Sequence, residues 1–358
     1  MEHNLTAPLT FRSGHQMKNR FALAPLTNHQ CEDDGMANDA EVKWLRMRAE
    51  GGFGMVMTCA AQIESGGRGQ GFPGQLGVHT DAMLPGMKRI AETLKNTFSV
   101  VQLHHAGIRS PQEVIGQQAV GPSAHEETGS RAMTKDEVQN VIQDFISAAV
   151  RSEKAGFDGV EVHGAHGYLL TQFMSTELNQ RSDEYGGSYE NRTRIVREII
   201  AGIKRECSEG FSVGIRLSPE GYGMPLTEVT RFCQELIDDG SLDYLDISLW
   251  DCSKESADEE FQGRSLLSYF TDLSWGDVKL VVAGKLKTPA DAEAMMEQGV
   301  DFVMLGRAGI LTHDFPNRYK VDPEFEATQL PVTAEHLESE GLSPAFIKYL
   351  SGWDGFVK

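Results

Sequence analysis

Eight short apolar runs alternate with helix-forming segments through most of this 358-residue chain. Each run is rich in Val, Ile, Leu or Phe, as strands buried on both faces of a parallel sheet are. Eight strands that alternate with helices predict a (β/α)8 barrel, whose usual size is about 250 residues. A doubly wound sheet is the alternative on strand number alone, but its GxGxxG fingerprint does not follow the first run. The runs are Arg20–Leu26, Gly54–Ala60, Phe98–His104, Gly159–His163, Ser212–Leu217, Tyr244–Leu249, Lys279–Ala283 and Phe302–Leu305.

Helix signals lie between these runs. Thr134 begins a capping box with Glu137, and Thr288 precedes Pro289 at a first helical position. No linker or shift in composition divides the chain, so we expect a single domain over 1–358. We place the barrel at about 15–313 and a C-terminal extension at 314–358, packed outside the barrel or against another subunit. The candidate N-caps are Asp39, Thr134, Thr227 and Thr288.

Charge and cysteine content restrict the partners and the compartment. The formal net charge is -19, which argues against nucleic acid or an anionic membrane as a partner, because both need a basic surface. The five Cys are scattered and lack a CxxC pair, so they predict neither a disulfide framework nor a zinc or iron–sulfur site. We find no secretory signal and no apolar run of about 20 residues, and we expect a cytoplasmic protein.

The stretch from Phe157 to Arg194 contains the largest group of candidate catalytic side chains. A strand pattern ends at His163, and a glycine-flanked turn then presents His166 and Tyr168. A long polar segment follows, and such loops inside a compact domain are usually functional. A histidine at a strand end is often structural, and a His-x-x-His pair could also be half of a metal site.

HGAHGYLL followed by NQRSDEYGGSYENR resembles the signature of the Old Yellow Enzyme family, the flavin-dependent ene reductases. The resemblance extends from APLT to MLGRAGI and implies a (β/α)8 fold with bound FMN and with NADH or NADPH as transient reductant. It implies that His163 and His166 bind the substrate carbonyl and that Tyr168 delivers a proton. The implied substrate is a small enone-type molecule.

The other strand ends carry candidate cofactor contacts. Gln102 lies inside an apolar strand and Arg216 inside another, and each must find a partner because burying either side chain unpaired is costly. Arg216 could pair with Glu161 or with an anionic ligand. By resemblance, Gln102 and Arg216 contact the flavin ring edge. The same resemblance places Pro25, Thr27 and Ala60 against the flavin and raises His29 as a candidate substrate contact.

Glycines follow the seventh and eighth runs, where barrels of this kind often bind phosphate. Gly284 and Gly306 would let a phosphate approach the backbone, and Arg307 could pair with it. Glycines at strand ends also occur without any phosphate, so this site is a prediction.

Three alternatives remain open. Some relatives in the family oxidatively demethylate amines on a similar barrel. From another class, a metal-dependent hydrolase could use His104, His105, His163 and His166, although Gly306 and Arg307 would then be unexplained. A non-catalytic FMN-binding or storage protein would leave the substrate residues unused. We expect a soluble reductant, because the iron–sulfur domains of some relatives need clustered Cys, and we consider a homodimer possible.

Overall fold

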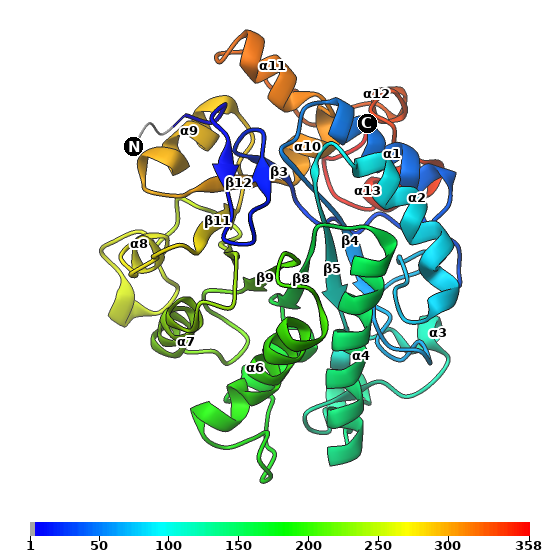
Figure 1. Cartoon of the computed structure of the whole chain (residues 1–358), viewed down its shortest axis with the longest axis vertical. Helices are drawn as coiled ribbons and strands as arrows, with labels where there is room; N and C mark the ends of the chain where they lie inside the picture. The colour runs from blue at the N-terminus through cyan, green and yellow to red at the C-terminus, as the bar shows by residue number, and fades with distance from the viewer. Residues whose placement is uncertain (1–3) are drawn as a thin grey trace.

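The computed structural model describes residues 4–358 and contains a closed barrel of eight parallel strands surrounded by helices (Figure 1). The predicted (β/α)8 fold is confirmed. Each strand pairs with the barrel strands before and after it in the chain, and β12 pairs with β3 to close the ring. The barrel strands are β3 (Phe21–Leu23), β4 (Met55–Gln62), β5 (Phe98–His104), β8 (Gly159–Gly164), β9 (Ser212–Leu217), β10 (Tyr244–Ser248), β11 (Lys279–Ala283) and β12 (Phe302–Leu305).

The longer helices pack their apolar faces on the barrel, and short helices and two small sheets occupy the connections. No helix among residues 4–358 combines the length and the apolar character needed to cross a membrane. The helices are α1 (Asp39–Glu50), α2 (Leu84–Leu94), α3 (Gln112–Ile115), α4 (Lys135–Ala155), α5 (Leu169–Met174), α6 (Tyr189–Glu206), α7 (Leu226–Asp239), α8 (Ser268–Thr271), α9 (Pro289–Glu297), α10 (Arg307–Leu311), α11 (Phe315–Val321), α12 (Ala334–Ser339) and α13 (Pro344–Ser351). The remaining strands are β1 (Leu9–Thr10), β2 (Gln16–Met17), β6 (Val120–Gly121) and β7 (Arg131–Ala132).

Two of the four predicted helix caps are present and two are wrong. Thr134 and Thr288 both form capping boxes. Asn38, not Asp39, caps α1, because its side chain accepts hydrogen bonds from two backbone amides of the first turn. Thr227 lies inside α7, whose N-cap position is Pro225. A proline just before the first turn starts this helix without any side-chain cap.

The barrel interior changes from apolar to polar along the strands. At the amino ends, Phe98, Tyr244 and Phe302 point inward with neighbouring apolar side chains. The β1–β2 hairpin closes this end, and its Phe11 ring lies 4.7 Å from the Phe98 ring. Two to four residues further along the strands, the inward positions hold Gln102 and other polar side chains. Strand side chains alternate between faces, so these polar residues form a layer inside the barrel.

The C-terminal segment covers one side of the carboxyl end of the barrel. In Figure 1, α12 and α13 lie beside α1. Trp44 of α1 packs edge-on against Phe346 of α13, with 5.1 Å between the ring centres. The buried Arg48 of α1 donates hydrogen bonds to the backbone carbonyls of Gly309 and Glu340. These contacts fix the extension against the barrel.

Candidate active site

A cavity of about 600 Å³ opens at the carboxyl ends of the barrel strands. It brings together every site residue that the sequence predicted except His29. The predicted residues that line it are Pro25, Thr27, Ala60, Gln102, His163, His166, Tyr168, Arg216, Gly284, Gly306 and Arg307. Residues from strands far apart in the chain therefore meet in one place, as the barrel topology requires.

His29 lies behind the cavity wall. Its ring stacks on Tyr349 at 4.6 Å and lies 5.2 Å from Phe72, and both of these residues line the cavity. Burial lowers the pKa of His29, so its ring is neutral and packs as an aromatic. The backbone at His29 is left-handed, with φ of 55°. His29 therefore supports the wall and is not among the residues that line the cavity.

The turn after β8 gathers three polar side chains on one side of the cavity. The His163 ring lies 5.0 Å from the His166 ring and 5.3 Å from the Tyr168 ring. The turn is tight, since His166 has φ of 62° and Gly167 has φ of 71°. A Cβ at Gly167 would come within 2.7 Å of the Tyr222 ring. The glycine is thus needed both for the backbone angle and for the space.

The two histidines are held neutral. Burial lowers the pKa of His163 well below its ordinary value, and the nearby His166, His104, Arg216 and Arg109 lower it further. Burial also lowers the pKa of His166, with the Arg216 and Arg109 cations adding to the effect. A neutral imidazole carries one N–H donor and one acceptor. Both rings are therefore available as uncharged hydrogen-bond donors.

Ser248 connects His166 to Arg216. Its Oγ lies 2.7 Å from His166 Nε2 and accepts a hydrogen bond from Arg216 Nη2 at 3.1 Å. The sequence prediction missed Ser248, although YLDIS shows polar residues at every second position of an apolar strand. That pattern is the available signal for inward-pointing polar groups.

An inner cluster of Glu161, Arg216 and Asp246 lies in the polar layer beneath the cavity. Arg216 Nε is 3.0 Å from Asp246 Oδ2, so Asp246 is the ion-pair partner. The expectation that Glu161 could fill this role is wrong: Glu161 accepts a hydrogen bond from Gln102 Nε2 at 2.8 Å instead. The register places Arg216 directly opposite Asp246 on the neighbouring strand, which explains the pairing.

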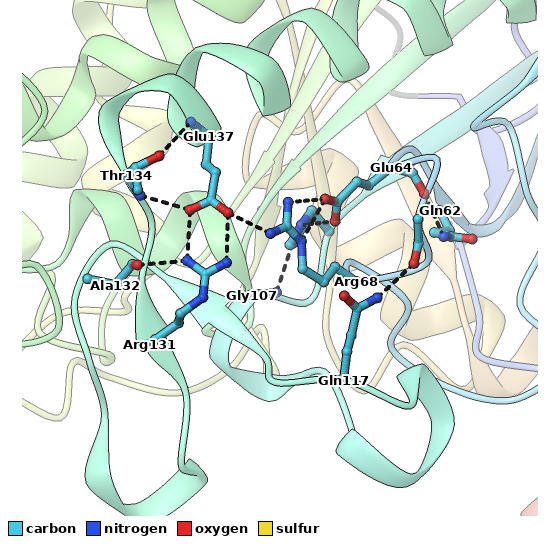
Figure 2. A network of polar contacts seen from close by, with 11 residues as sticks. Gln62, Glu64, Arg68, Gly107, Gln117, Arg131, Ala132, Thr134 and Glu137 are labelled. Atoms are coloured by element: carbon cyan, nitrogen blue, oxygen red, sulfur yellow. Dashed lines mark hydrogen bonds and ion pairs between the residues drawn. The ribbon is translucent and has the colours of Figure 1, made fainter.

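An outer network of charged residues joins the segment after β4 to β7 and to the start of α4 (Figure 2). Arg68 donates to Glu64 and to Glu137, and Arg131 donates two hydrogen bonds to Glu137. His105 Nε2 lies 3.0 Å from Glu64 Oε2, while its Nδ1 accepts from the Gly107 amide. His105 therefore belongs to this network, whereas its neighbour His104 lines the cavity.

Several aromatic residues at the cavity mouth were not anticipated from the sequence. Trp250 follows β10 with a left-handed φ of 61°, is 61% exposed, and lies 5.4 Å from the His166 ring. Tyr349 and Trp353 reach the cavity from α13 and the residues after it. The C-terminal extension thus forms part of the cavity wall. No sequence pattern that we recognise signals this docking.

The cavity fits the flavin that the resemblance implies. His163 Nδ1 is buried and has no hydrogen-bond partner among residues 4–358, so a polar donor or acceptor is unused at this wall. A Cβ at Gly306 would meet only Leu26, at 3.6 Å, so there is open space beside Gly306. A Cβ at Gly284 would instead meet the backbone of residues 250–252, with Asp251 N at 2.9 Å, so the space beside Gly284 is filled by the protein. Ala24, Ala60 and Ala283 leave room for a flat ring. By contrast, no group of three or more His, Cys, Asp or Glu within residues 4–358 is arranged to hold a metal ion.

Comparisons with known proteins agree with this geometry. A sequence model of the NADH:flavin oxidoreductase / NADH oxidase family matches residues 4–324. The probable NADH-dependent flavin oxidoreductase YqiG of Bacillus subtilis (strain 168) is 38% identical over 316 residues, which are 85% of this chain and 84% of the relative. Some other relatives are longer, and the chain spans 33% to 49% of their length.

Solved structures show the same architecture. The Old Yellow Enzyme homologue from Zymomonas mobilis superimposes with a TM-score of 0.79 at 26% identity, covering 93% of this chain and 96% of that one. Morphinone reductase in complex with tetrahydroNAD gives a TM-score of 0.77 at 26% identity, covering 99% and 98%. The chain therefore belongs to the NADH:flavin oxidoreductase / NADH oxidase family, the family of the Old Yellow Enzymes, and is an NAD(P)H-dependent flavin oxidoreductase with FMN as its bound cofactor.

Proposed function

We propose that this enzyme reduces the activated C=C bond of α,β-unsaturated carbonyl compounds. The observation that carries the proposal is the grouping of neutral His163 and His166 with Tyr168 in the same cavity as the residues that fit the flavin. When bound, FMN supplies the hydride transfer, from NADH or NADPH to the β-carbon of the substrate. The protein contributes orientation, charge and the proton.

His163 and His166 bind the substrate carbonyl oxygen in this proposal. Ser248 Oγ accepts a hydrogen bond from Arg216, so its own proton is free to be donated to His166 Nε2. The neutral His166 ring then carries its proton on Nδ1 and can donate it to the carbonyl. Two fixed donors stabilise the negative charge that develops on the oxygen as the β-carbon is reduced.

Tyr168 donates the proton to the α-carbon as the general acid. The edge of its ring lies against His104, with 4.4 Å between the ring centres, and the Arg109 guanidinium lies 4.6 Å over its face. These contacts fix the direction of the phenol. Among the other residues that line the cavity, Gly284, Gly306 and Arg307 would hold the FMN phosphate, Gln102 and Arg216 would contact the ring edge, and Pro25, Thr27 and Ala60 would contact the ring.

One anaerobic titration tests the proposal. The purified protein should show a flavin spectrum that bleaches with NADH or NADPH and returns when a cyclic enone is added. Bleaching without return would remove the enone assignment and favour another oxidant, including the demethylase chemistry of some relatives. A colourless protein that takes up no FMN and needs a divalent metal would contradict both.

Tyr168→Phe separates the two half-reactions. We expect bleaching by the nicotinamide cofactor to be unchanged and reoxidation by the enone to slow by about 10²–10⁴-fold, the usual contribution of a general acid. Tyr222→Phe is a matched control, because the Tyr222 ring packs on Gly167 but is not part of the cavity lining. Equal reoxidation rates in wild type and Tyr168→Phe would remove Tyr168 from the proton transfer.

A further inference from the structure

The inner cluster contains two carboxyl groups and one cation in a fully buried position. Glu161 and Asp246 have no exposed surface, and Arg216 is 7% exposed. Glu161 on β8 and Asp246 on β10 lie on either side of β9, which carries Arg216. Between them, β9 has Gly214, and the Tyr244 ring occupies the place that a Cβ there would need. The Tyr244 ring therefore fills the space that Gly214 leaves beside Glu161.

Most oxygens of the two carboxyl groups accept no hydrogen bond, and two buried donors of the cluster, Tyr244 Oη and Arg216 Nε, are also without a partner among residues 4–358. Glu161 Oε1 accepts from Gln102, but Glu161 Oε2 has no hydrogen-bond partner among residues 4–358. Arg216 Nε is close to Asp246 but is not aligned for a hydrogen bond, so neither Asp246 oxygen accepts one within the described chain. Two like charges in a buried site with one cation favour the retention of a proton by one of them.

We propose that Glu161 and Asp246 together retain one proton at neutral pH. This proton determines the net charge of the inner cluster, and with it the electrostatic effect of Arg216 on the flavin edge. The proposal rests on FMN binding and goes beyond the proposed ene reduction, because it holds for any substrate. With the proton in place, Arg216 and the single carboxylate balance each other. Loss of the proton gives the inner cluster one net negative charge beneath the cavity.

The electrostatics of the surrounding groups support this assignment. Burial and the neighbouring Asp246 raise the pKa of Glu161 to about 8, against the opposing effects of Arg216, Gln102 and Tyr244. Burial raises the pKa of Asp246 to about 6, against the effect of Arg216. The groups that face the pair are thus Arg216 from β9, Tyr244 from β10 and Gln102 from β5. His163, one inward position above Glu161 on β8, is held neutral.

The shared proton has a consequence for the cofactor site. Arg216 and Gln102 both line the cavity, so the net charge of the inner cluster acts on the edge of the flavin ring that we propose they contact. A fixed cation favours negative charge at that edge. When the pair loses its proton, the added carboxylate opposes Arg216, and the site stabilises negative charge less well. The pair thereby makes the midpoint potential of bound FMN depend on pH above about 8.

The test uses the oxidised, FMN-loaded enzyme without any substrate, so its outcome is independent of the ene-reductase proposal. Infrared spectroscopy should detect the carbonyl stretch of a protonated carboxylic acid at neutral pH, and this signal should be lost as the pH rises past about 8. Glu161→Gln and Asp246→Asn should each change or remove this component. Absence of such a signal from wild type at neutral pH would overturn the proposal even if neither variant folds. Because Glu41 can contribute a component of its own, the two variants assign the signal, and a component that both retain in full would also overturn the proposal.

A potentiometric titration supplies the second readout. In wild type, a plot of FMN midpoint potential against pH should change slope near pH 8, and Glu161→Gln should lose this change. Glu41→Gln is a matched control: Glu41 is also fully buried, with a pKa raised by burial to about 7, but it accepts hydrogen bonds from Asn28 and Gln30. That control should remove its own infrared component and keep the change of slope. Retention of the change in Glu161→Gln would contradict the proposal.

Discussion

The inner cluster and the outer network both combine arginine with carboxyl side chains, but they differ in how many of the carboxyl oxygens accept hydrogen bonds. In the outer network, Arg68 and Arg131 share two carboxylates, and each of the four carboxylate oxygens accepts at least one hydrogen bond (Figure 2). The inner cluster has one arginine for two carboxyl groups, and it pairs with Asp246 alone; three of the four carboxyl oxygens accept no hydrogen bond within the described chain.

The pKa values of these carboxyl groups depend on how many hydrogen bonds each one accepts, and not on burial alone. Burial by itself would raise the pKa of Glu64, but hydrogen bonds and charge from His105 and Arg68 lower it to about 2. Arg131 is the main cause that lowers the pKa of Glu137. Burial and the neighbouring Asp246 raise the pKa of Glu161 to about 8, because fewer hydrogen bonds oppose them there. The outer network holds loops in place. In the inner cluster, oxygens of Glu161 and Asp246 remain without a hydrogen bond next to the cofactor site.

Removing the cation of the inner cluster should have the largest effect on stability. Arg216→Met leaves Asp246 buried without a partner and should lower the free energy of unfolding by about 3–5 kcal/mol, as for other broken buried ion pairs. Urea unfolding of the FMN-loaded protein at neutral pH measures the loss. Arg216→Lys keeps the charge and serves as the control, with a smaller expected loss. A loss below about 1 kcal/mol in Arg216→Met, the range of exposed pairs, would mean that the cation does not stabilise the cluster.

Removing one cation of the outer network should cost less. Arg68→Met deletes hydrogen bonds to Glu64 and Glu137, each an ionised group, and should lower the free energy of unfolding by about 1.5–3 kcal/mol. His105 still serves Glu64, and Arg131 still serves Glu137. The control is Arg131→Met at a more exposed position, where we expect a smaller loss. If Arg131→Met costs more than Arg68→Met, the central position assigned to Arg68 is wrong.

The two regions should respond to pH with opposite signs. The folded-state pKa of Glu161 is raised from 4.5 to about 8, so its contribution to stability falls as the pH rises through that window. The folded-state pKa of Glu64 is lowered from 4.5 to about 2, so its contribution is present above 4.5 and is lost as the pH falls toward 2. Unfolding free energies measured from acid to pH 9 should show that Glu161→Gln removes part of the decline between about pH 4.5 and about pH 8. An unchanged decline would place its origin elsewhere.

These two regions also show what sequence patterns can and cannot predict. Parallel strands buried on both faces are continuous apolar runs, so all eight barrel strands were located from the sequence. Gln102 and Arg216 were detectable because polar side chains stand out in such runs. Their partners were not, since pairing depends on the register between strands, and that register places Asp246 opposite Arg216.

Contacts between distant parts of the chain also could not be predicted from local sequence patterns. Helix α5 has six residues, too few for a helical periodicity to be recognised, and it follows directly from Tyr168. The docking of α13 depends on its packing against α1 through Trp44 and Phe346, which are 302 positions apart in the sequence. The role of His29 as a support for Tyr349 could only be seen once that docking was known.

An exposed ion pair should give the smallest loss of unfolding free energy among these ion pairs. Arg318 Nε lies 2.8 Å from Asp314 Oδ1 across one helical turn, with side chains that are 47% and 31% exposed. Water already solvates both charges, and holding them together costs side-chain entropy, so Arg318→Ala should lower the free energy of unfolding by less than about 0.5 kcal/mol. The same urea titration measures it, and added salt should make the difference smaller still. A loss as large as that of Arg68→Met would show that distance alone ranks these ion pairs. A small loss would mean that burial and the number of donors per carboxylate oxygen rank them, which is the distinction between the inner cluster and the outer network.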